Sequence, residues 1–408
     1  MAERRKTVAV LFGGRSVEHD VSILTGLQYL EALDQSRYRG LPVYIAPDGQ
    51  WWTGEALRRR GFYPLSAANA SELQPVTLPV GVPVGGPPHL LAPRSSLLGT
   101  KLDRIGIDIA VPALHGSHGE DGALAGMLTF AGIPYAGCRA LGAAAAMDKH
   151  MTKQVLRGLD IPVLDHWLAT RPGAGDFLTG ETVRPALEAA LGADPYPVIV
   201  KPRRLGSSIG VRIARDMDAL LAALSAAFRL DDAALVEPLV PDLVEYNIAV
   251  MRRGGEIATS AVETPLKSAD LLDFREKYLS GEDAGGPKLD AAPSEGMASL
   301  NREIAPDSLT PEEDGKLRRW AGAAFAALDL AGTPRIDFLC NRKTGEIWLN
   351  EVNPIPGSFA YFLWQAATPP LSFTDLASAL VEEGLALSVT GPGETTAGAG
   401  GAEIFRRG

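Results

Sequence analysis

The feature that most constrains the fold is a pair of short strand-like segments around one turn near the C-terminal end. Residues 335–338 and 350–354 flank Lys343-Thr344-Gly345. A short turn between two such segments predicts an antiparallel β-hairpin. If the hairpin is centred on Thr344, residues equally far from Thr344 lie opposite each other. This part of the chain is therefore predicted to contain antiparallel strands.

Alternation along the two strands places four polar side chains on one face. They form two cross-strand pairs: Asp337 opposite Glu351, and Arg335 opposite Asn353. Two carboxylates and an amide beside an arginine suit hard divalent cations that bridge a phosphate-bearing ligand. The alternative is a solvated hairpin face. Because Leu339 and Leu349 continue the same face toward the turn, we expect a partly covered cleft instead.

The composition is that of a globular protein of two or three domains, with 408 residues, 46% of them apolar and 22% charged. The net charge of −10 disfavours a nucleic acid or an acidic membrane as a partner. The two cysteines, Cys138 and Cys340, are expected to be buried free thiols. Residues 1–6 are polar and no apolar run has the length of a membrane span, so we expect a cytoplasmic protein.

Residues 1–137 have the pattern of a parallel α/β domain. We expect strands at 7–12, 41–46, 107–112 and 133–136, and helices at 20–33 and 123–131. Residues 65–94, rich in proline, glycine and valine, are interpreted as an irregular excursion. The loops that follow the strands gather at one edge of such a sheet, where ligands bind.

Residues 138–238 form the predicted central domain. We expect helices at 141–159 and 216–228, and strands at 161–164, 196–202 and 209–214. The glycine-serine loop 203–208 thus joins two strands. A Walker loop joins a strand to a helix, so the usual P-loop nucleotide fold is disfavoured.

Residues 239–388 are predicted to form a largely antiparallel α+β domain. It contains a long, weakly patterned stretch at 268–306 and a helix at 311–328. Residues 389–408 are rich in glycine, threonine and alanine, and we expect a disordered tail there.

Lys201 ends an apolar strand beside the glycine-serine loop, where an ammonium group can meet a polyphosphate. The hydroxyls of Ser207 and Ser208 can donate to the same oxygens. A lysine that snorkels at a strand end is the alternative. Three further candidates resemble surface groups when taken alone, although the two carboxylates could accept hydrogen bonds from adenine or ribose: Lys149, Glu237 and Glu245.

Two loops of the N-terminal domain carry further candidates. His115 follows a strand and precedes a glycine-rich helix start, whose amides could bind an anion. Glu18 could hold a substrate ammonium, or could simply favour the dipole of the following helix. His115 and His118 are only three residues apart with no obvious third ligand, so a zinc site is disfavoured.

Five motifs resemble, in order, those of the D-alanine–D-alanine ligases, which are ATP-grasp enzymes: residues 13–22, 115–122, 147–149, 200–210 and 335–357. The resemblance implies a three-domain fold, α/β and α+β, with ATP held between the central and C-terminal domains. It implies a ligase that joins two D-alanine molecules through an acylphosphate for peptidoglycan precursors. ATP as a substrate, two Mg²⁺ (or Mn²⁺) ions and a homodimer are further implications.

The resemblance also implies a role for each candidate residue. ATP would be bound by Lys149, Lys201, Ser207, Ser208, Glu237 and Glu245, and the metal ions by Asp337, Glu351 and Asn353. The tetrahedral oxyanion would be stabilised by Arg335 and the Gly357 amide. The first substrate would meet His115 and Glu18, the latter linked to Ser207 and Tyr278. A mobile loop that contains Lys277 and Tyr278 would close over the site.

One position departs from the family pattern. Where the family usually has a serine that holds the carboxylate of the second substrate, this chain has Phe362, while Lys277 and Ser358 remain candidates for that contact. The change favours, as an alternative, a related ligase that couples D-alanine or another amino acid to a different amino or hydroxy acid. A non-catalytic nucleotide-binding protein is a third hypothesis, which the intact set of hairpin residues disfavours.

Overall fold

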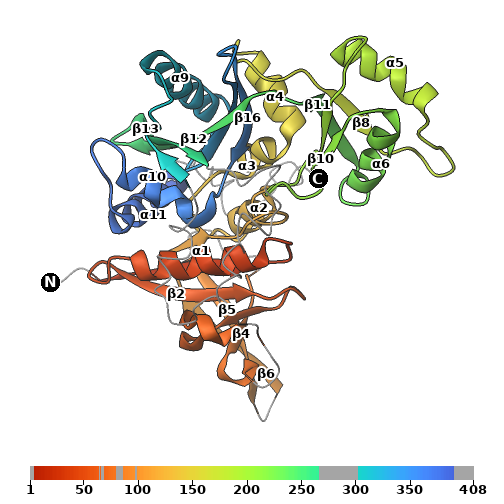
Figure 1. The fold of residues 1–408 in the computed structure, drawn as a ribbon. Helices are drawn as coiled ribbons and strands as arrows, with labels where there is room; N and C mark the ends of the chain where they lie inside the picture. Colours follow the sequence, from red (N-terminus) through yellow and green to blue (C-terminus); the bar gives the residue numbers. More distant parts are fainter. Residues whose placement is uncertain are drawn as a thin grey trace, which may run out of the picture.

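The computed structural model describes residues 4–63, 65, 69–79, 86–96, 99–265 and 302–389. These residues form three units, each built on one sheet, that meet near the middle of the molecule (Figure 1). The N-terminal unit lies at the bottom of the view, the central unit at the upper right and the C-terminal unit at the upper left. The mixture of α/β and α+β units agrees with the predicted fold class.

The N-terminal sheet has the strand order β4-β3-β2-β1-β7. Its strands are β1 (Lys6–Gly13), β2 (Tyr38–Ile45), β3 (Trp51–Thr53), β4 (Gln74–Val76) and β7 (Ile109–Pro112). As predicted, β1 pairs in parallel with its two neighbours, β2 and β7, while β3 and β4 add an antiparallel edge. The carboxyl ends of β1 and β7 therefore lie side by side where the strand order reverses, which is the usual ligand position in such sheets.

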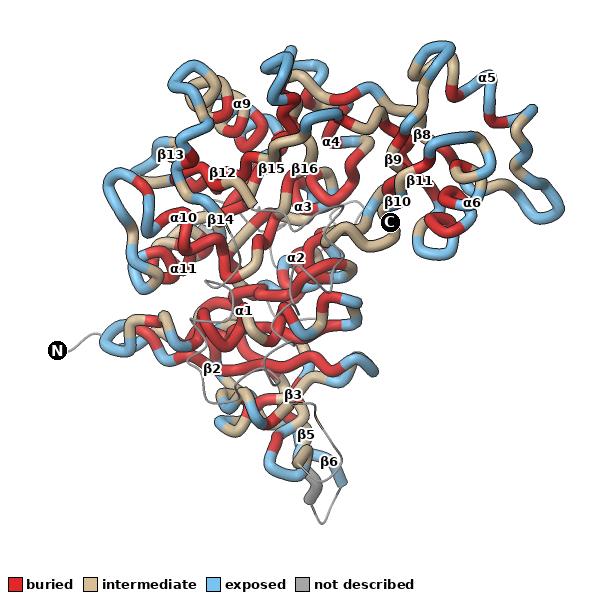
Figure 2. Tube along the Cα trace, in the orientation of Figure 1, coloured by how far each residue is buried: buried red, intermediate tan, exposed pale blue. Residues whose placement is uncertain are grey.

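In the described residues this sheet is accompanied by the helices α1 (His19–Ala32) and α2 (Ala123–Phe130) and by the short 3-10 helices η1 (Glu55–Arg58), η2 (Arg60–Phe62) and η3 (Ala70–Glu72). The predicted strand at 133–136 is reduced to one bridge, between Tyr135 and Ala110. The predicted irregular excursion at 65–94 is wrong in two places: β4 joins the main sheet, and β5 (His89–Ser96) forms an antiparallel ribbon with β6 (Gly99–Gly106). The residues of β6 are mostly exposed (Figure 2), and the strand has no buried apolar face whose alternation would predict it.

The central unit contains an antiparallel sheet of order β10-β9-β11-β8. Its strands are β8 (Trp167–Thr170), β9 (Val198–Pro202), β10 (Arg212–Ala214) and β11 (Ala233–Pro238), and its helices are α5 (Gly180–Leu191) and α6 (Met217–Ala227). The glycine-serine loop joins β9 to β10, as predicted. The strand predicted at 161–164 is wrong, because the backbone becomes a strand only at β8.

The helix predicted at 141–159 is two helices, α3 (Ala140–Met147) and α4 (Lys149–Arg157). Asp148 separates them with an extended backbone, and its Oδ1 accepts a hydrogen bond from the Met151 amide at 3.0 Å. Asp148 is thus the N-cap of α4. The break turns the α4 N-terminus and Lys149 toward the loop after β9, where the Lys149 amide donates to the Arg203 carbonyl at 3.2 Å.

The C-terminal sheet is antiparallel and has the order β14-β13-β12-β15-β16. Its strands are β12 (Leu243–Arg253), β13 (Glu256–Pro265), β14 (Arg302–Ile304), β15 (Arg335–Asn341) and β16 (Ile347–Asn353), and the accompanying helices are α9 (Pro311–Ala327), η5 (Gly357–Ala360), α10 (Tyr361–Gln365) and α11 (Phe373–Val389). Side chains such as Ile248 and Val250 pack toward α9 in one core. Ala249 and Met251 point to the opposite face and pack with α10 and α11 in another core.

The hairpin of β15 and β16 has the predicted register at the polar end. Asp337 pairs with Glu351, and Arg335 with Asn353. A β-bulge follows, so that Phe338 pairs with Leu349. The prediction that Leu339 shares the face of Asp337 is confirmed, because β15 alternates regularly, but the same prediction for Leu349 is wrong: the bulge inserts Asn350 into β16 and turns Leu349 to the opposite face with Phe338.

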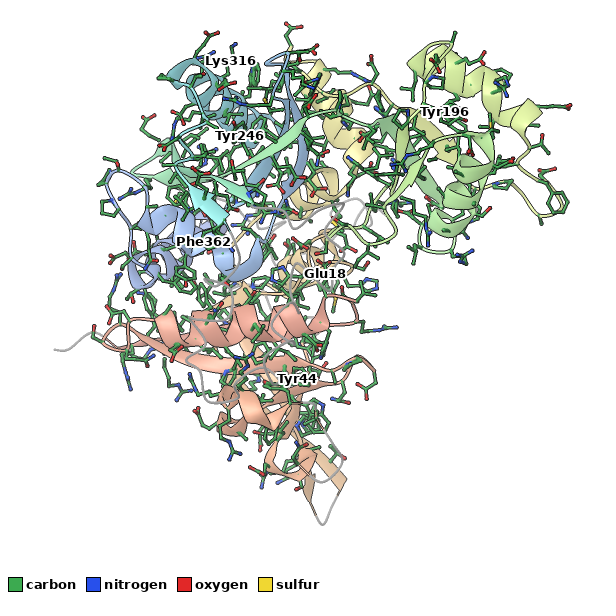
Figure 3. All side chains as sticks on the ribbon, in the orientation of Figure 1. Glu18, Tyr44, Tyr196, Tyr246, Lys316 and Phe362 are labelled. Atoms are coloured by element: carbon green, nitrogen blue, oxygen red, sulfur yellow. The ribbon has the colours of Figure 1, made fainter. Side chains whose placement is uncertain are left out.

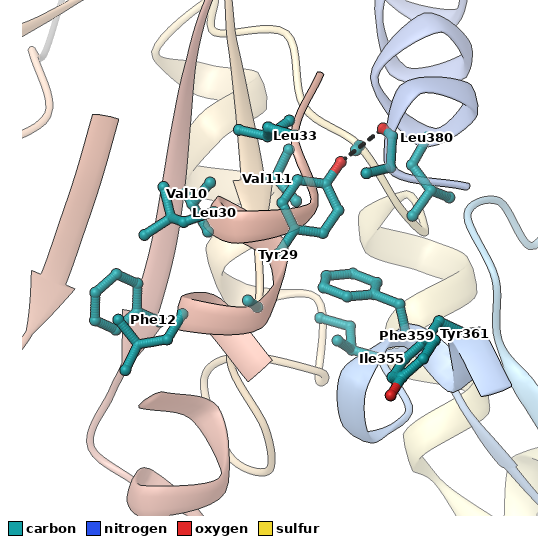
Figure 4. Close-up of a cluster of buried hydrophobic side chains, with 14 of the residues drawn as sticks. Val10, Phe12, Tyr29, Leu30, Leu33, Val111, Ile355, Phe359, Tyr361 and Leu380 are labelled. Atoms are coloured by element: carbon teal, nitrogen blue, oxygen red, sulfur yellow. Dashed lines mark hydrogen bonds between the residues drawn. The ribbon is translucent and has the colours of Figure 1, made fainter. Parts of the chain in front are cut away.

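The N-terminal and C-terminal units share one hydrophobic core. Figure 4 shows Tyr29 of α1 beside Phe359 and Leu380, which come from η5 and α11. The Tyr29 hydroxyl donates to the Ala377 carbonyl at 2.9 Å. α11 therefore packs on the unit that contains β1, although it follows β1 by more than 300 residues in the sequence (Figure 1).

Candidate functional site

Glu18 lies at the centre of the molecule, where the three units meet (Figure 3). It precedes α1 at the carboxyl end of β1, and it is buried. The Ser207 hydroxyl of the glycine-serine loop donates a hydrogen bond to Glu18 Oε1. A Cβ added to Gly116 would lie 2.4 Å from Glu18 Oε2, so the loop after β7 also packs against this carboxylate. The structure thus brings together three of the predicted loops around Glu18.

His115 and Glu120 hold the chain segment that leads to Gly357. His115 Nε2 lies 2.8 Å from the Thr25 hydroxyl, and burial lowers the pKa of His115 to about 4 although a backbone hydrogen bond with Ile355 opposes the shift. Glu120 accepts hydrogen bonds from the amides of Ile355 at 3.2 Å and Gly116 at 2.7 Å. Burial, and then the nearby Glu18, raises the pKa of Glu120 to about 8. Sequence reasoning assigned no role to Glu120, although it stands in the glycine-rich motif after His115.

Two lysines share the buried carboxylate of Glu237. Lys153 Nζ lies 2.8 Å from Oε1, and Lys201 Nζ lies 2.7 Å from Oε2. Burial alone would raise the pKa of Glu237, but Lys153 and Lys201 outweigh it and lower the pKa to about 2. Glu237 was predicted at the adenine; in the structure its carboxylate contacts these two ammonium groups.

Lys153 was missed in the sequence, although a signal for it exists. The buried residues of α4 are Lys149, Thr152, Lys153 and Leu156, which recur at helical spacing on one face. A lysine on the same face as Leu156 is placed inside the protein, and it then needs a carboxylate partner.

Two lysines from different elements, Lys201 of β9 and Lys149 of α4, reach the hairpin of the C-terminal unit. Lys201 Nζ donates to Asn350 Oδ1 at 3.0 Å, and Lys149 Nζ lies 3.5 Å from Glu351 Oε2. Lys149 also donates to the Leu205 carbonyl at 2.5 Å. No role was predicted for Asn350, although the sequence contains a sign of the bulge. Leu349 and Val352 are both buried but lie three residues apart, which breaks the alternation of β16.

Arg335 and Asp337 form a bidentate pair at the polar end of the hairpin. The guanidinium Nε and Nη2 donate to the two carboxylate oxygens at 2.7 Å each, and Asn353 Nδ2 donates to Asp337 Oδ2 at 2.9 Å. Within the described ranges there is no group of three or more His, Cys, Asp or Glu residues that could hold a metal ion. Asp337, Glu351 and Asn353 instead offer two carboxylates and an amide on neighbouring strands, and each carboxylate already faces a cationic side chain.

The remaining predicted residues are distributed as follows. Burial would lower the pKa of Lys201, but nearby carboxylates raise it. The strongest of these is Glu237, followed by Glu351 and by Glu245 on β12. Ser208 has a left-handed backbone, φ 58°, in the same loop as Ser207. Gly357 begins η5. Lys277 and Tyr278 lie outside the described residues.

Ser358 lies on η5, which packs against α1, and Phe362 lies on α10, which packs against β12 and β13. Ser358 is fully buried, its amide donates to the Thr25 hydroxyl at 3.2 Å, and its own hydroxyl donates to Gln28. For Ser358 to donate to a substrate carboxylate, the bond to Gln28 would have to break, because a hydroxyl has only one donor hydrogen. The ring of Phe362 lies under the guanidinium of Arg302, with 3.7 Å between Cζ and the ring centroid.

Two antiparallel sheets meet at Lys201, with Lys149 of α4 beside it, and an α/β unit supplies Glu18. This arrangement defines the class of ATP-grasp ligases. The family model for the D-Ala D-Ala ligase N-terminus matches residues 7–138, and the model for the C-terminus matches residues 155–382. The chain belongs to the D-alanine–D-alanine ligase family.

Relatives and solved structures agree with this assignment. The chain is 35% identical over 360 residues to a D-alanine–D-alanine ligase from Thermosipho africanus, covering 88% of each chain, and 34% identical over 383 residues to one from Deinococcus radiodurans, covering 93% of this chain and 98% of that one. Among solved structures it resembles the VanG D-Ala:D-Ser ligase from Enterococcus faecalis, with a TM-score of 0.71 and 26% identity over 93% of this chain and 100% of that one. A similar fold, with a TM-score of 0.70, 24% identity and coverage of 94% and 95%, occurs in the D-alanine–D-alanine ligase from Coxiella burnetii.

Proposed function

We propose that this protein is an ATP-dependent ligase that joins two D-alanine molecules through an acylphosphate intermediate. The observation that carries the proposal is the contact between Glu18 and Ser207. It sets a carboxylate suited to an amino-acid ammonium against the loop suited to phosphate, beside Lys149 and Lys201. A nucleotide-binding protein without ligase activity would not need an ammonium-binding carboxylate at its phosphate loop.

The proposed reaction has two steps. The donor carboxylate attacks the γ-phosphorus of ATP, ADP leaves and the acylphosphate forms. The acceptor amine then attacks the acyl carbon, the carbon–oxygen bond to phosphate breaks, and phosphate leaves while the nitrogen loses a proton to the phosphate or to water. Glu18 orients the donor through its ammonium group, while Lys149 and Lys201 bind phosphate oxygens. Arg335 and the Gly357 amide stabilise the oxyanion of the second step.

Divalent metal ions, two Mg²⁺ in our proposal, would be held by the hairpin residues Asp337, Glu351 and Asn353. The donor set fits, because carboxylate and amide oxygens are the ligands that such hard cations prefer. Arg335 pairs with the carboxylate of Asp337, and Lys149 with that of Glu351. This face of the hairpin therefore attracts cationic groups. When bound, the ions would offset the negative charge on the transferred phosphoryl group.

The test is a product analysis with purified protein, ATP, Mg²⁺ and D-alanine. We expect phosphate release in step with formation of the dipeptide, both read from the same reaction by a phosphate assay and mass spectrometry. Phosphate release without any condensed product would contradict the ligase proposal, and no turnover with any amino acid would favour the non-catalytic alternative.

A different acceptor is the second candidate, and Phe362 motivates it. A ring in place of a hydroxyl changes both the volume and the hydrogen bonding of the acceptor pocket. One similar structure, VanG, is described as a D-Ala:D-Ser ligase. Acceptors offered in competition with D-alanine decide between the two: a preference for D-alanine contradicts this second candidate.

The residues beyond the site add two points. No helix in the described part of the chain is long and apolar enough to cross a membrane. We propose that the protein is cytoplasmic, acts on small amino acids and forms a homodimer. Sedimentation analysis of the purified protein would test the homodimer.

A further inference from the structure

A row of polar side chains crosses the C-terminal sheet on the face that carries the predicted metal ligands. Asp337 on β15 pairs with Asn247 on β12, and Asn247 pairs with Glu263 on β13. Cross-strand partners point to the same face of a sheet. The hydrogen bond from Asn247 Nδ2 to Glu263 Oε1, 3.2 Å long, agrees with this placement. The row therefore extends the site two strands beyond Asp337.

Arg302 stands at the far end of this row. Its Nη1 lies 2.8 Å from Glu263 Oε2, and the two side chains are 11% and 4% exposed. The row thus has an arginine–carboxylate pair at each end, with Arg335 and Asp337 at the other. Burying an ion pair carries a desolvation cost that two apolar side chains would avoid. The second pair therefore suggests a function beyond stability.

Phe362 fixes the orientation of Arg302. The guanidinium Cζ lies 3.7 Å from the ring centroid, a stacked contact that holds the planar guanidinium in one place. Phe362 belongs to the same core as Ala249, which lies two residues from Asn247 on the same face of β12. The ring is thus part of the layer that covers the face with the polar row. Its position is the one at which the family resemblance implies a serine.

We propose that Arg302 binds the carboxylate of the acceptor, which is therefore an amino acid with a free carboxylate. This inference rests on the proposed ligase function. Neighbouring strands lie about 4.8 Å apart, so Glu263 is about 10 Å from Asp337 along the row. That span accommodates one amino acid, with its amine toward the acylphosphate and its carboxylate toward Arg302. A guanidinium has five N–H donors, and it can bind a carboxylate with two of them while Nη1 keeps its bond to Glu263.

The experiment compares two assays in which D-alanine has different roles. In the first, dipeptide formation requires D-alanine as both donor and acceptor. In the second, hydroxylamine replaces the acceptor: its nitrogen attacks the acyl carbon, phosphate leaves, and a hydroxamate forms. The second assay reports only ATP and donor binding and acylphosphate formation, and it also shows that a variant is folded.

The variants are Arg302→Ala, Arg302→Lys and the control Arg318→Ala. Arg318 contacts β13 from the opposite face, through a 2.8 Å bond from Nη1 to the Thr259 hydroxyl, and pairs with Asp314. For Arg302→Ala we expect the KM for D-alanine in dipeptide formation to rise at least about tenfold, because a charged hydrogen bond to the acceptor is lost. Hydroxamate formation should change less than about threefold. Arg302→Lys keeps the charge without the planar fork, so its KM should lie between the two.

Two results would overturn the inference. One is a dipeptide KM within about twofold of the wild-type value, as we expect for Arg318→Ala. The other is an equal loss of dipeptide formation and hydroxamate formation, which would show that Arg302 has only a structural role. As a further readout, wild type should discriminate against D-alaninol, which lacks the carboxylate, and Arg302→Ala should lose this discrimination. If wild-type protein forms neither hydroxamate nor dipeptide, the proposed function itself fails, and the result is distinct from failure of the inference.

Discussion

At the scale of single residues, the site depends on one carboxylate that is shared by two ammonium groups. Glu237 binds Lys153 and Lys201, and only Lys201 continues to the hairpin, through Asn350. Lys153 therefore acts on the site through Glu237 and Lys201. Its ammonium offsets part of the charge of Glu237, so that Lys201 is held without being fully neutralised.

Replacing Lys153 with methionine should show this role through pH. The pKa of Glu237 is lowered to about 2, so its contribution to stability is present above the pKa in the unfolded chain and is lost as pH falls toward 2. Without Lys153, burial raises the pKa of Glu237 and the loss begins at a higher pH. At pH 7 we expect a loss of about 3–5 kcal/mol in the free energy of unfolding, measured by urea denaturation.

Lys316→Met is the matched control for this change. Lys316 (labelled in Figure 3) forms a solvent-accessible pair with Glu312, whose side chain is 79% exposed, and such surface pairs contribute about 0–1 kcal/mol. Unfolding curves of Lys153→Met that parallel the wild type from pH 3 to 7 would show that Lys153 does not set the charge state of Glu237.

The pairing register could be predicted from the sequence where side chains alternate regularly along the strands. The pairing of Asp337 with Glu351 followed from the turn position alone, and the structure confirms it. The contacts of Glu237 were not readable in this way, because its partners come from α4 and β9, and the sequence shows no spacing that relates them. Tertiary packing alone places two lysines at one carboxylate.

At the scale of elements, the break between α3 and α4 positions Lys149. Asp148 ends one helix and caps the next, and it also pairs with Arg203, whose Nη2 lies 2.7 Å from Oδ2. The sequence predicted one continuous helix, because the apolar pattern does not stop at the break. An aspartate that can accept from the amide three residues later was the available signal.

Asp148→Ala should affect both stability and ATP binding. We expect a loss of about 1–2 kcal/mol from the cap alone, and a higher KM for ATP because the Lys149 end of α4 is no longer held. Asp216 caps α6 in the same way, with a 2.8 Å bond from the Ala219 amide, and supplies the control. Asp216→Ala should lose similar stability by thermal unfolding with an unchanged KM for ATP. Equal effects of both variants on the KM would show that the α4 cap has no special role.

At the scale of the whole molecule, the N-terminal and C-terminal units are not independent bodies. The core around β1 includes side chains from η5, α10 and α11, so the boundaries predicted from sequence separate residues that pack together. Sequence patterns find an apolar face, but they do not identify the distant segment that covers it. The domain division therefore stays a prediction, while the parallel pairing of β1 and the antiparallel pairing of β15 with β16 are confirmed.

Leu380→Ala tests this shared core. Leu380 is 1% exposed on α11, and truncating a buried leucine costs about 2–5 kcal/mol. We expect the N-terminal and C-terminal units to lose stability together, as one shifted transition in calorimetry. Leu141→Ala, at a position 80% exposed, should leave the transition unchanged. A Leu380→Ala protein in which only one of two separate transitions moves would contradict a common core.

The packing of α11 against the first sheet also has a consequence for synthesis. A ribosome releases β1 early, yet Tyr29 and its neighbours gain the side chains of residues 373–389 only when nearly the whole described chain has been made. Domains usually fold as units as they emerge, starting from the N-terminus. Here the nascent first sheet would keep an apolar surface uncovered through most of translation, which is the period in which a chaperone would bind it.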